Sequence, residues 1–454
     1  MRRASRSLAG LAVLLLAMVG LATPAAAAVD CTFAAPTATV TADAGDPVTI
    51  VRSGEAIHVN GTACDNATVA NTDTLDFQTT GVLASVTIDL SGGPFAPGAT
   101  AESDDSSEIE INLPADVPVI RVLGSSGADH VTAGATGINL NANETTADVD
   151  VAITGTPSIE LDGADGDDVL SIGGGAGMGV AVRGTLRGGL ANDTLTTGAP
   201  GSAIDGGDGT DTVDYSGAAA LEEANLATGQ VIHAAGGTDT LTSIESFIGS
   251  PGDDTIVGSE GDDTIDGGDG SDTIDYSGAA GAVVVDLARR SATGQGTDVL
   301  RNIENVIGSD HNDTVSGDDG ANVLDGGAGD DTVSFRSSSS GVTVNLKQGT
   351  AEGAGDDTLI GFEHVQGSPE ADEITGDGRA NRLEGLAGND TVFGKAGDDR
   401  IIGGNGNDRL LGQGGDDVLR GEHGRDQHNG GRGRDHCKGG PGPDSFVLCE
   451  NFPT

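Results

Sequence analysis

One aliphatic side chain recurs every nine residues in the C-terminal part of the chain, among glycine and polar residues. The clearest units between residues 367 and 447 read GLAGNDTVF, GKAGDDRII, GGNGNDRLL and GQGGDDVLR. They follow the scheme G-x-x-G-[DN]-D-x-U-x, where U is aliphatic. The residues after position six predict a short strand with one inward side chain, because successive side chains of a strand point to opposite faces. In these four units the inward residues at position eight are Val392, Ile401, Leu410 and Leu419.

The first six residues of each unit predict a tight turn. Glycine stands at positions one and four. We expect positive φ angles there, because such a turn needs them and glycine adopts them readily. Two units then make one coil with two strands and two turns. Units repeated at a fixed period bury their apolar faces against their neighbours. The pattern therefore predicts an all-β fold, a parallel β-roll or β-helix solenoid with two parallel sheets around a thin aliphatic core.

Position six carries an aspartate in each clear unit, which raises an electrostatic problem. Stacked strands lie about 4.8 Å apart, and bare carboxylates that close repel one another. A cation between consecutive turns would remove this repulsion. Flexible coordination by carboxylate and carbonyl oxygens is what Ca²⁺ prefers. Because the coil alternates sides, we expect ligands to pair two units apart, Asp390 with Asp408 and Asp399 with Asp417.

Similar units recur upstream, within a longer repeat. Units begin at residues 206, 249, 258, 267, 308 and 326, and weaker copies begin at residues 124, 163 and 188. The longer repeat is marked by Glu245, Glu304 and Glu363, which are 59 residues apart. We expect each of these 59-residue modules to insert about two irregular coils between runs of nonapeptides. The expected organisation is a signal peptide at 1–28, a β-rich N-terminal cap region at 29–120, a degenerate β-solenoid at 121–205, nonapeptides with super-repeats at 206–366, a contiguous β-roll at 367–447 and a C-terminal tail at 448–454.

The N-terminus reads as a signal for export. Arg2, Arg3 and Arg6 precede an apolar stretch from Leu11 to Leu21, and small residues before residue 29 offer a cleavage site. The apolar stretch is short for a membrane span, although an uncleaved anchor helix is the alternative. No other segment of the sequence suits a bilayer, so we expect a secreted, extracellular protein without a membrane span after cleavage.

The cap region and the cysteines fit this location. Residues 31–64 alternate apolar and polar side chains over short stretches, as strands do, and a cap would cover the unpaired strand edges at the end of a solenoid. The four cysteines lie near the two ends of the exported chain, where disulfides form. Zinc is the competing explanation, but no CxxC spacing supports it. We expect disulfides between Cys31 and Cys64 and between Cys437 and Cys449.

Charge limits the partners. The chain has 71 Asp and Glu against 22 Lys and Arg, and its net charge is -49. Nucleic acids and anionic membrane surfaces would repel such a protein, whereas cations would be attracted. The 76 glycines and the absence of tryptophan also argue against a conventional globular core.

The nonapeptide resembles the haemolysin-type, or RTX, calcium-binding repeat, with the consensus GGxGxDxUx. The resemblance is specific over residues 367–447, good over 206–334 outside the inserts and weak over 124–205. It implies a parallel β-roll whose turns bind Ca²⁺ through the position-six aspartate and backbone carbonyls, and which folds when calcium binds. Carried over to this chain, the implied calcium ligands are Asp211, Asp254, Asp263, Asp272, Asp313, Asp331, Asp372, Asp390, Asp399, Asp408 and Asp417.

The sequence departs from the family pattern in several units. Asn322 and Asn381 occupy position six and should weaken their sites. The last three units are interpreted as a disulfide-locked cap with poor calcium affinity, because arginine stands beside two of their aspartates and position eight is no longer aliphatic. These units contain Asp426, Asp435 and Asp444 at position six, His428, Cys437 and Phe446 at position eight, and Arg425 and Arg434 at position five.

Motifs for catalysis are missing from the sequence. It contains no HExxH zinc motif, no GxSxG nucleophile elbow and no GxxxxGK[ST] phosphate loop. We therefore expect a non-enzymatic calcium-binding protein, disordered without calcium, with a structural or surface and matrix role. Surface polysaccharide or another extracellular macromolecule is a candidate partner. The alternatives are a carbohydrate-active β-helix enzyme, either a lyase or an epimerase, and an adhesin or ice-binding solenoid.

Overall fold

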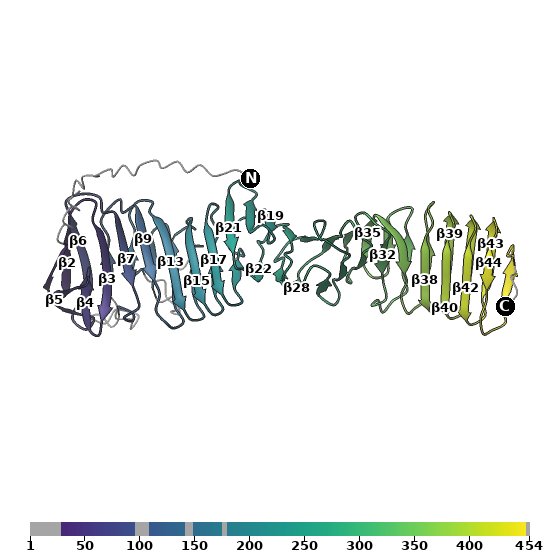
Figure 1. Ribbon diagram of the computed structural model, residues 1–454, viewed down its shortest axis with the longest axis horizontal. Coiled ribbons are helices and arrows are strands. Elements are labelled where there is room, and N and C mark those ends of the chain that lie inside the picture. Colours follow the sequence, from purple (N-terminus) through teal and green to yellow (C-terminus); the bar gives the residue numbers. More distant parts are fainter. Residues whose placement is uncertain (1–28, 96–108, 141–148, 175–178, 451–454) are drawn as a thin grey trace, which may run out of the picture.

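The chain forms an elongated stack of short strands. The computed structural model describes residues 29–95, 109–140, 149–174 and 179–450, so the expected signal peptide lies outside the described residues, as does the end of the expected tail. Figure 1 shows the strands following one another along the long axis in chain order, from β2 (Thr37–Ala42) at one end to β44 (His436–Lys438) at the other. Across the described ranges, no helix is long and apolar enough to cross a membrane.

The nonapeptide run forms the predicted two parallel sheets. In one sheet β38 pairs with β40 and β40 with β42, and in the other β39 pairs with β41 and β41 with β43. Leu383, Ile401 and Leu419 stack in one sheet, and Val392 and Leu410 in the other. All five side chains are fully buried, which confirms position eight as the core position. The strands are β38 (Arg382–Ala387), β39 (Thr391–Ala396), β40 (Arg400–Asn405), β41 (Arg409–Gly414), β42 (Val418–His423) and β43 (Gln427–Arg432).

The N-terminal region belongs to the same stack. In one sheet β3 (Pro47–Ser53), β7 (Ser85–Asp89), β9 (Val119–Leu123) and β13 (Ser158–Asp165) pair in parallel, one after another. The described residues between 29 and 120 therefore contribute coils of their own, with apolar side chains such as Ile50, Ile88 and Ile120 in the continuous core.

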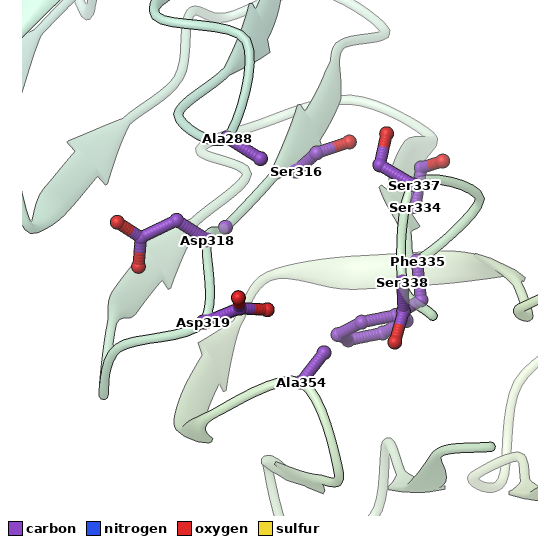
Figure 2. A pocket seen from close by; sticks show the side chains of 10 residues that line it. Ala288, Ser316, Asp318, Asp319, Ser334, Phe335, Ser337, Ser338 and Ala354 are labelled. Carbon is purple, nitrogen blue, oxygen red and sulfur yellow. The ribbon is translucent and has the colours of Figure 1, made fainter. Parts of the chain in front are cut away.

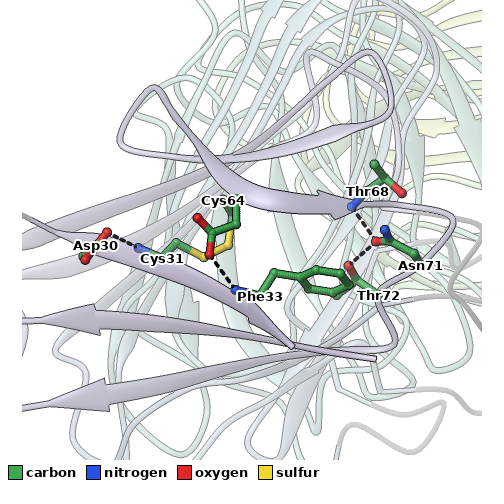
Figure 3. Close-up of a disulfide and its surroundings, with 8 residues drawn as sticks. Asp30, Cys31, Phe33, Cys64, Thr68, Asn71 and Thr72 are labelled. Carbon is green, nitrogen blue, oxygen red and sulfur yellow. Dashed lines mark hydrogen bonds between the residues drawn. A yellow bond between two sulfur atoms is a disulfide. The ribbon is translucent and has the colours of Figure 1, made fainter. Parts of the chain in front are cut away.

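Antiparallel strands lie at this end of the stack. β1 pairs with β2, and β4 pairs with both β3 and β5. A disulfide between Cys31 and Cys64 joins β1 to β5, and beside it the Phe33 amide donates a hydrogen bond to Asp65 Oδ2 (Figure 3). The strands are β1 (Asp30–Ala34), β2 (Thr37–Ala42), β4 (Ala56–Val59) and β5 (Thr62–Thr68).

Each module of the longer repeat inserts three short strands. The first strand pairs with the following coil, the third pairs with the preceding coil, and the middle strand joins them in antiparallel fashion. The inserts remain in register with the stack instead of forming the irregular coils expected from the sequence, and successive inserts lie in alternate sheets. They comprise β19 (Leu221–Asn225), β20 (Gln230–His233) and β21 (Thr238–Thr242), then β26 (Val284–Asp286), β27 (Ser291–Thr293) and β28 (Thr297–Arg301), then β33 (Thr343–Asn345), β34 (Thr350–Glu352) and β35 (Asp356–Ile360).

The C-terminal coil is only partly covered. β44 (His436–Lys438) and β45 (Ser445–Val447) add to the two sheets, and a disulfide joins Cys437 to Cys449. His428 is buried at its position eight, and Phe446, its partner in the sheet, faces the same way but is 41% exposed. The ring of Phe446 stacks on His428 at 4.9 Å between centroids, with no further described coil beyond it.

Candidate metal centre

The position-six aspartates form two files along the stack, one at each row of turns. In one file the amide of Asp390 donates to Oδ1 of Asp408 at 3.0 Å, and the amide of Asp399 donates to Oδ1 of Asp417 at 2.8 Å in the other. These are the two pairs expected from the sequence. The same contact links Asp254 to Asp272, Asp313 to Asp331, Asp372 to Asp390, Asp408 to Asp426 and Asp417 to Asp435.

The second carboxylate oxygen is left without a partner in many turns. Asp390 is 1% exposed, and its Oδ2 has no hydrogen-bond partner among the described residues. A Cβ built on Gly385 would lie against this Oδ2 and 2.7 Å from the Gly403 carbonyl oxygen of the next coil. Glycine at position one therefore leaves a small space that both oxygens face. We call these turns open, and their aspartates are Asp168, Asp193, Asp211, Asp272, Asp331, Asp390, Asp399, Asp408, Asp417, Asp426 and Asp435.

Backbone angles correct the sequence prediction for position one. Gly385 does not have positive φ, whereas Leu386 at position two has φ 78° and Gly388 at position four has φ 121°. The prediction holds for position four and is wrong for position one. Glycine is needed there because the carboxylate occupies the space of a side chain. Position two takes the strained conformation instead, even with the non-glycine residues Lys395 (φ 85°) and Gln413 (φ 76°).

A second class of turn is closed by serine at position two. The Ser368 amide donates to Oδ2 of Asp372 at 2.7 Å, and the Ser368 hydroxyl donates to Oδ1 at 2.6 Å. Both carboxylate oxygens thus have partners within their own turn. Of the predicted ligands, the aspartates in serine-closed turns are Asp254, Asp263, Asp313 and Asp372.

The two asparagine turns are also closed. Asn381 Oδ1 accepts a hydrogen bond from the Asp377 amide at 2.9 Å, and its Nδ2 donates to the Glu363 carbonyl at 3.0 Å. Asn322 makes the same two contacts with Asp318 and Glu304. The amide side chain supplies a donor to the neighbouring coil that a carboxylate cannot supply.

The structure adds acidic residues that the sequence reasoning missed. Asp239, Asp298 and Asp357 occupy position six of imperfect units in the inserts and accept amide hydrogen bonds from Ser202, Asp263 and Asn322. Each lies six residues before a landmark glutamate and two before a leucine, and this spacing is the signal that could have found them. The landmark residues Glu245, Glu304 and Glu363 occupy position six as well, where they accept the amides of Asp211, Asp272 and Asp331.

Tyrosine hydroxyls complete two of these insert sites. Tyr215 donates to Asp239 Oδ2 at 3.1 Å, and Tyr276 donates to Asp298 Oδ2 at 2.7 Å. Phe335 stands at the corresponding place in the third module, and Asp357 Oδ2 has no hydrogen-bond partner among the described residues.

Burial dominates the electrostatics of the open turns. Burial, opposed by a backbone hydrogen bond and assisted by a neighbouring carboxylate in the file, raises the pKa of Asp390 and Asp399 from an ordinary value of 3.8 to about 7. Within the described ranges, no lysine or arginine forms an ion pair with either residue. Negative charge in these turns is therefore uncompensated by side chains, which favours a bound cation.

The donor set suits calcium better than a transition metal. Among the described residues, no group of three or more His, Cys, Asp or Glu side chains is placed to hold a metal ion. An open turn instead combines a carboxylate oxygen with backbone carbonyl oxygens, which are hard ligands of the kind that Ca²⁺ takes. The turns thus fit calcium.

The two arginines of the last units do not neutralise the buried aspartates. Arg434 forms an exposed ion pair with Asp416 at 2.9 Å, and the Arg425 amide donates to Asn407 Oδ1. Asp426 and Asp435 meanwhile keep the open arrangement, with exposures of 0% and 1%. The charge argument for poor calcium affinity therefore does not apply to these two turns.

Two cavities in the described residues differ in size and in lining. One of about 30 Å³ lies between Asp318 and Asp319 on one side and the ring of Phe335 and Ala354 on the other (Figure 2). This is roughly the volume of one water molecule. A larger cavity of about 340 Å³ lies near Ile153, Pro157 and Arg183, and its lining contains no carboxylate.

Comparison with known proteins agrees with this geometry. The fold and the turns define a parallel β-roll with a calcium-binding type of turn. The family model described as RTX calcium-binding nonapeptide repeat (4 copies) matches residues 248–280, 306–337, 366–401, 375–410 and 402–437. The chain therefore carries RTX calcium-binding repeats, and these repeats support calcium binding. Comparison with curated proteins finds no match.

Proposed function

We propose that the protein is an exported, non-catalytic calcium-binding solenoid with a structural or matrix-forming role, whose coils are held together by Ca²⁺ in the open turns. The observation that carries this proposal is the buried, unpartnered Oδ2 of the open-turn aspartates beside a carbonyl oxygen of the next coil. In the example of Asp390, the proposed ligands are its Oδ2 and the Gly403 carbonyl. A divalent cation supplies the positive charge that the two files lack.

Calcium would then act as a folding ligand. Ligands from different coils come together only after stacking, so the free energy of binding contributes to the free energy of folding. Extracellular modules bind Ca²⁺ with dissociation constants of roughly 10⁻⁴ to 10⁻³ M. A chain of this affinity would stay unfolded until it met a calcium-rich medium.

An extracellular location is supported by the two disulfides near opposite ends of the described chain. Disulfides persist in oxidising compartments. Together with β1, β4 and β5, the first disulfide would form the cap that protects the N-terminal edge of the stack. An elongated stack of coils of this kind suits a structural part of a surface or matrix.

Calcium titration of the full exported chain tests the proposal. We expect circular dichroism to gain β-sheet signal as calcium is added and to lose it in chelator, because uncompensated buried carboxylates oppose stacking. Calorimetry and small-angle scattering of the same samples would measure stoichiometry and compaction. A magnesium titration serves as control, because Mg²⁺ demands stricter geometry. A spectrum that is the same in calcium and in chelator would refute the proposal.

A further inference from the structure

A cavity of about 340 Å³ opens between two neighbouring coils in the N-terminal half of the stack. Its described lining comes from the end of β10 (His130–Gly134), the loop that leads from β12 (Val151–Ala152) into β13, and the residues just before β15 (Gly184–Leu190). Pockets that bind small molecules commonly measure about 300–1,000 Å³. The cavity lies outside the residues matched by the repeat family, which begin at residue 248, and none of the open-turn aspartates lines it.

Long connections between the two sheets account for this space. In the next regular coil, six residues join β16 (Thr194–Thr196) to β17 (Ala203–Asp208). Twelve residues join β14 (Val169–Ser171) to β15, although β10 still pairs with β14 and β13 with β15 in parallel. The preceding coil adds β12 and the antiparallel strand β11 (Gly137–Asn139) between β10 and β13. Because the strands keep their register while the connections lengthen, the described parts of these connections enclose a space between them.

The walls of the cavity are mainly apolar. Ile159 is fully buried and Ile153 is 8% exposed, and both belong to the aliphatic core between the sheets. Val182 is half-buried and packs against the same core, and Pro157 and Ala135 also line the cavity. A hydrocarbon chain that entered the cavity would leave water for contact with aliphatic side chains, and this transfer is favourable.

Arg183 supplies positive charge at the rim of the cavity. Its side chain is exposed, and no acidic side chain in the described ranges forms an ion pair with it. A Cβ built on Gly201 would lie 3.8 Å from Arg183 Cδ, so the stem of the arginine runs beside the next coil. The described lining contains no carboxylate, although the chain has 71 Asp and Glu. An unpaired guanidinium beside an apolar space attracts an anion, and its planar fork suits a carboxylate.

We infer that this cavity binds a small aliphatic carboxylate, with its hydrocarbon chain against Ile153, Ile159 and Val182 and its carboxylate oxygens accepting hydrogen bonds from Arg183. At the roughly 30 Å³ that one water molecule takes in the liquid, the cavity has room for about ten non-hydrogen atoms, which is the size of octanoate. Calcium takes no part in this site. The protein therefore offers a ligand site of a second chemical kind, beyond the proposed calcium-binding function.

Calorimetric titration of the full chain in saturating calcium tests this site, with octanoate, 1-octanol and acetate as probes. We expect octanoate to bind at a single site. Octanol should bind about tenfold or more weakly, because it lacks the charge that pairs with Arg183. Acetate should show no binding, because it lacks the hydrocarbon chain. Octanoate that fails to bind, or octanol that binds as tightly as octanoate, would overturn the inference.

Arg183→Gln keeps the cavity and removes the charge, so it should weaken octanoate binding about tenfold or more and leave octanol binding unchanged. Arg187→Gln is the matched control, because Arg187 is also exposed, has no ion pair among the described residues and does not line the cavity. Ala135→Phe should fill the cavity and weaken the binding of both probes. If Ala135→Phe does not fold, Arg183→Gln decides, and an octanoate affinity equal to that of the parent chain would refute the site.

Circular dichroism of the same samples separates this site from calcium-dependent folding. A chain that gains β-sheet signal in calcium but does not bind octanoate would refute the ligand site and leave the proposed function standing. A chain that binds octanoate and has the same β-sheet signal in calcium and in chelator would refute the proposed function alone.

Discussion

At the scale of the residue, position two decides what each aspartate can do. A serine there satisfies both carboxylate oxygens, as in Asp372, whereas a residue with positive φ leaves Oδ2 unpartnered, as in Asp390. The aspartate is common to both classes, so its presence alone does not identify a site. The identity of the second residue is the better criterion.

At position one, even the methyl side chain of alanine should disturb the turn. We expect Gly385→Ala to lower the free energy of unfolding in calcium by about 1–3 kcal/mol, because its Cβ would collide with Asp390 Oδ2 and the Gly403 carbonyl. Calcium affinity should fall in parallel, since the carboxylate must move. Urea unfolding at fixed calcium measures the first effect and calorimetry the second.

Gly378→Ala is the matched control for this change. Nothing lies within 4 Å of a Cβ at Gly378, and its φ is not positive. Its effect should stay within about 0.5 kcal/mol. Equal losses in the two variants would show that the space at position one is unimportant.

At the scale of the element, two of the three inserts place a buried tyrosine hydroxyl on the carboxylate oxygen that has no partner in an open turn. We expect Tyr276→Phe to lower the free energy of unfolding by about 1–3 kcal/mol, because a buried carboxylate oxygen loses its donor. Asp298 Oδ2 accepts this hydroxyl at 2.7 Å. Thermal or urea unfolding in saturating calcium measures the change.

Phe335→Tyr is the reciprocal test in the third module. The cavity of about 30 Å³ beside Phe335 has room for a hydroxyl group, and Asp357 Oδ2 is unpartnered within the described residues. This variant should be at least as stable as the parent chain. Destabilisation by Phe335→Tyr together with no effect of Tyr276→Phe would contradict the assigned role of the hydroxyl.

The strands and inserts also show which parts of the fold could be predicted from the sequence. The aliphatic position eight predicted the strands, the two parallel sheets and the buried Val392 and Leu410, because one inward side chain per unit leaves a single way to stack the coils. The sequence predicted an insert in each module but as about two irregular coils, because the antiparallel strands interrupt the nine-residue period and leave no pattern of their own. Asp298 was missed for this reason. The unit that contains Asp193 was found at residue 188, but only as a weaker copy, in which Ala191 replaces glycine at position four. The serine-closed class was also missed, although serine at position two can be read in the sequence, because the repeat pattern treats that position as variable.

At the scale of the whole molecule, buried carboxylates couple folding to pH when calcium is removed. The pKa of Asp390 and Asp399 rises from an ordinary 3.8 to about 7 on burial. Between these values the folded chain binds protons that the unfolded chain has lost, so stability without calcium falls as pH rises from about 4 to about 7. In chelator, the β-sheet signal should therefore increase when the pH is lowered from 8 to about 5.

In saturating calcium the stability of the fold should instead increase with pH, because protons compete with the ion for the same carboxylates. The measurement is circular dichroism against pH, once in chelator and once in saturating calcium. A chelated chain that is more ordered at pH 8 than at pH 5 would argue against buried, uncompensated carboxylates in the calcium-free fold.

The alternation of the inserts has a consequence for the evolution of such rods. Successive 59-residue modules place their inserted strands in opposite sheets, so Glu245 and Glu363 lie at one row of turns and Glu304 at the other. Loss or duplication of a single module would transfer every downstream side chain to the opposite face of the rod. A gain or loss of modules in pairs would preserve the faces, so length variation that respects a binding surface should come in steps of two.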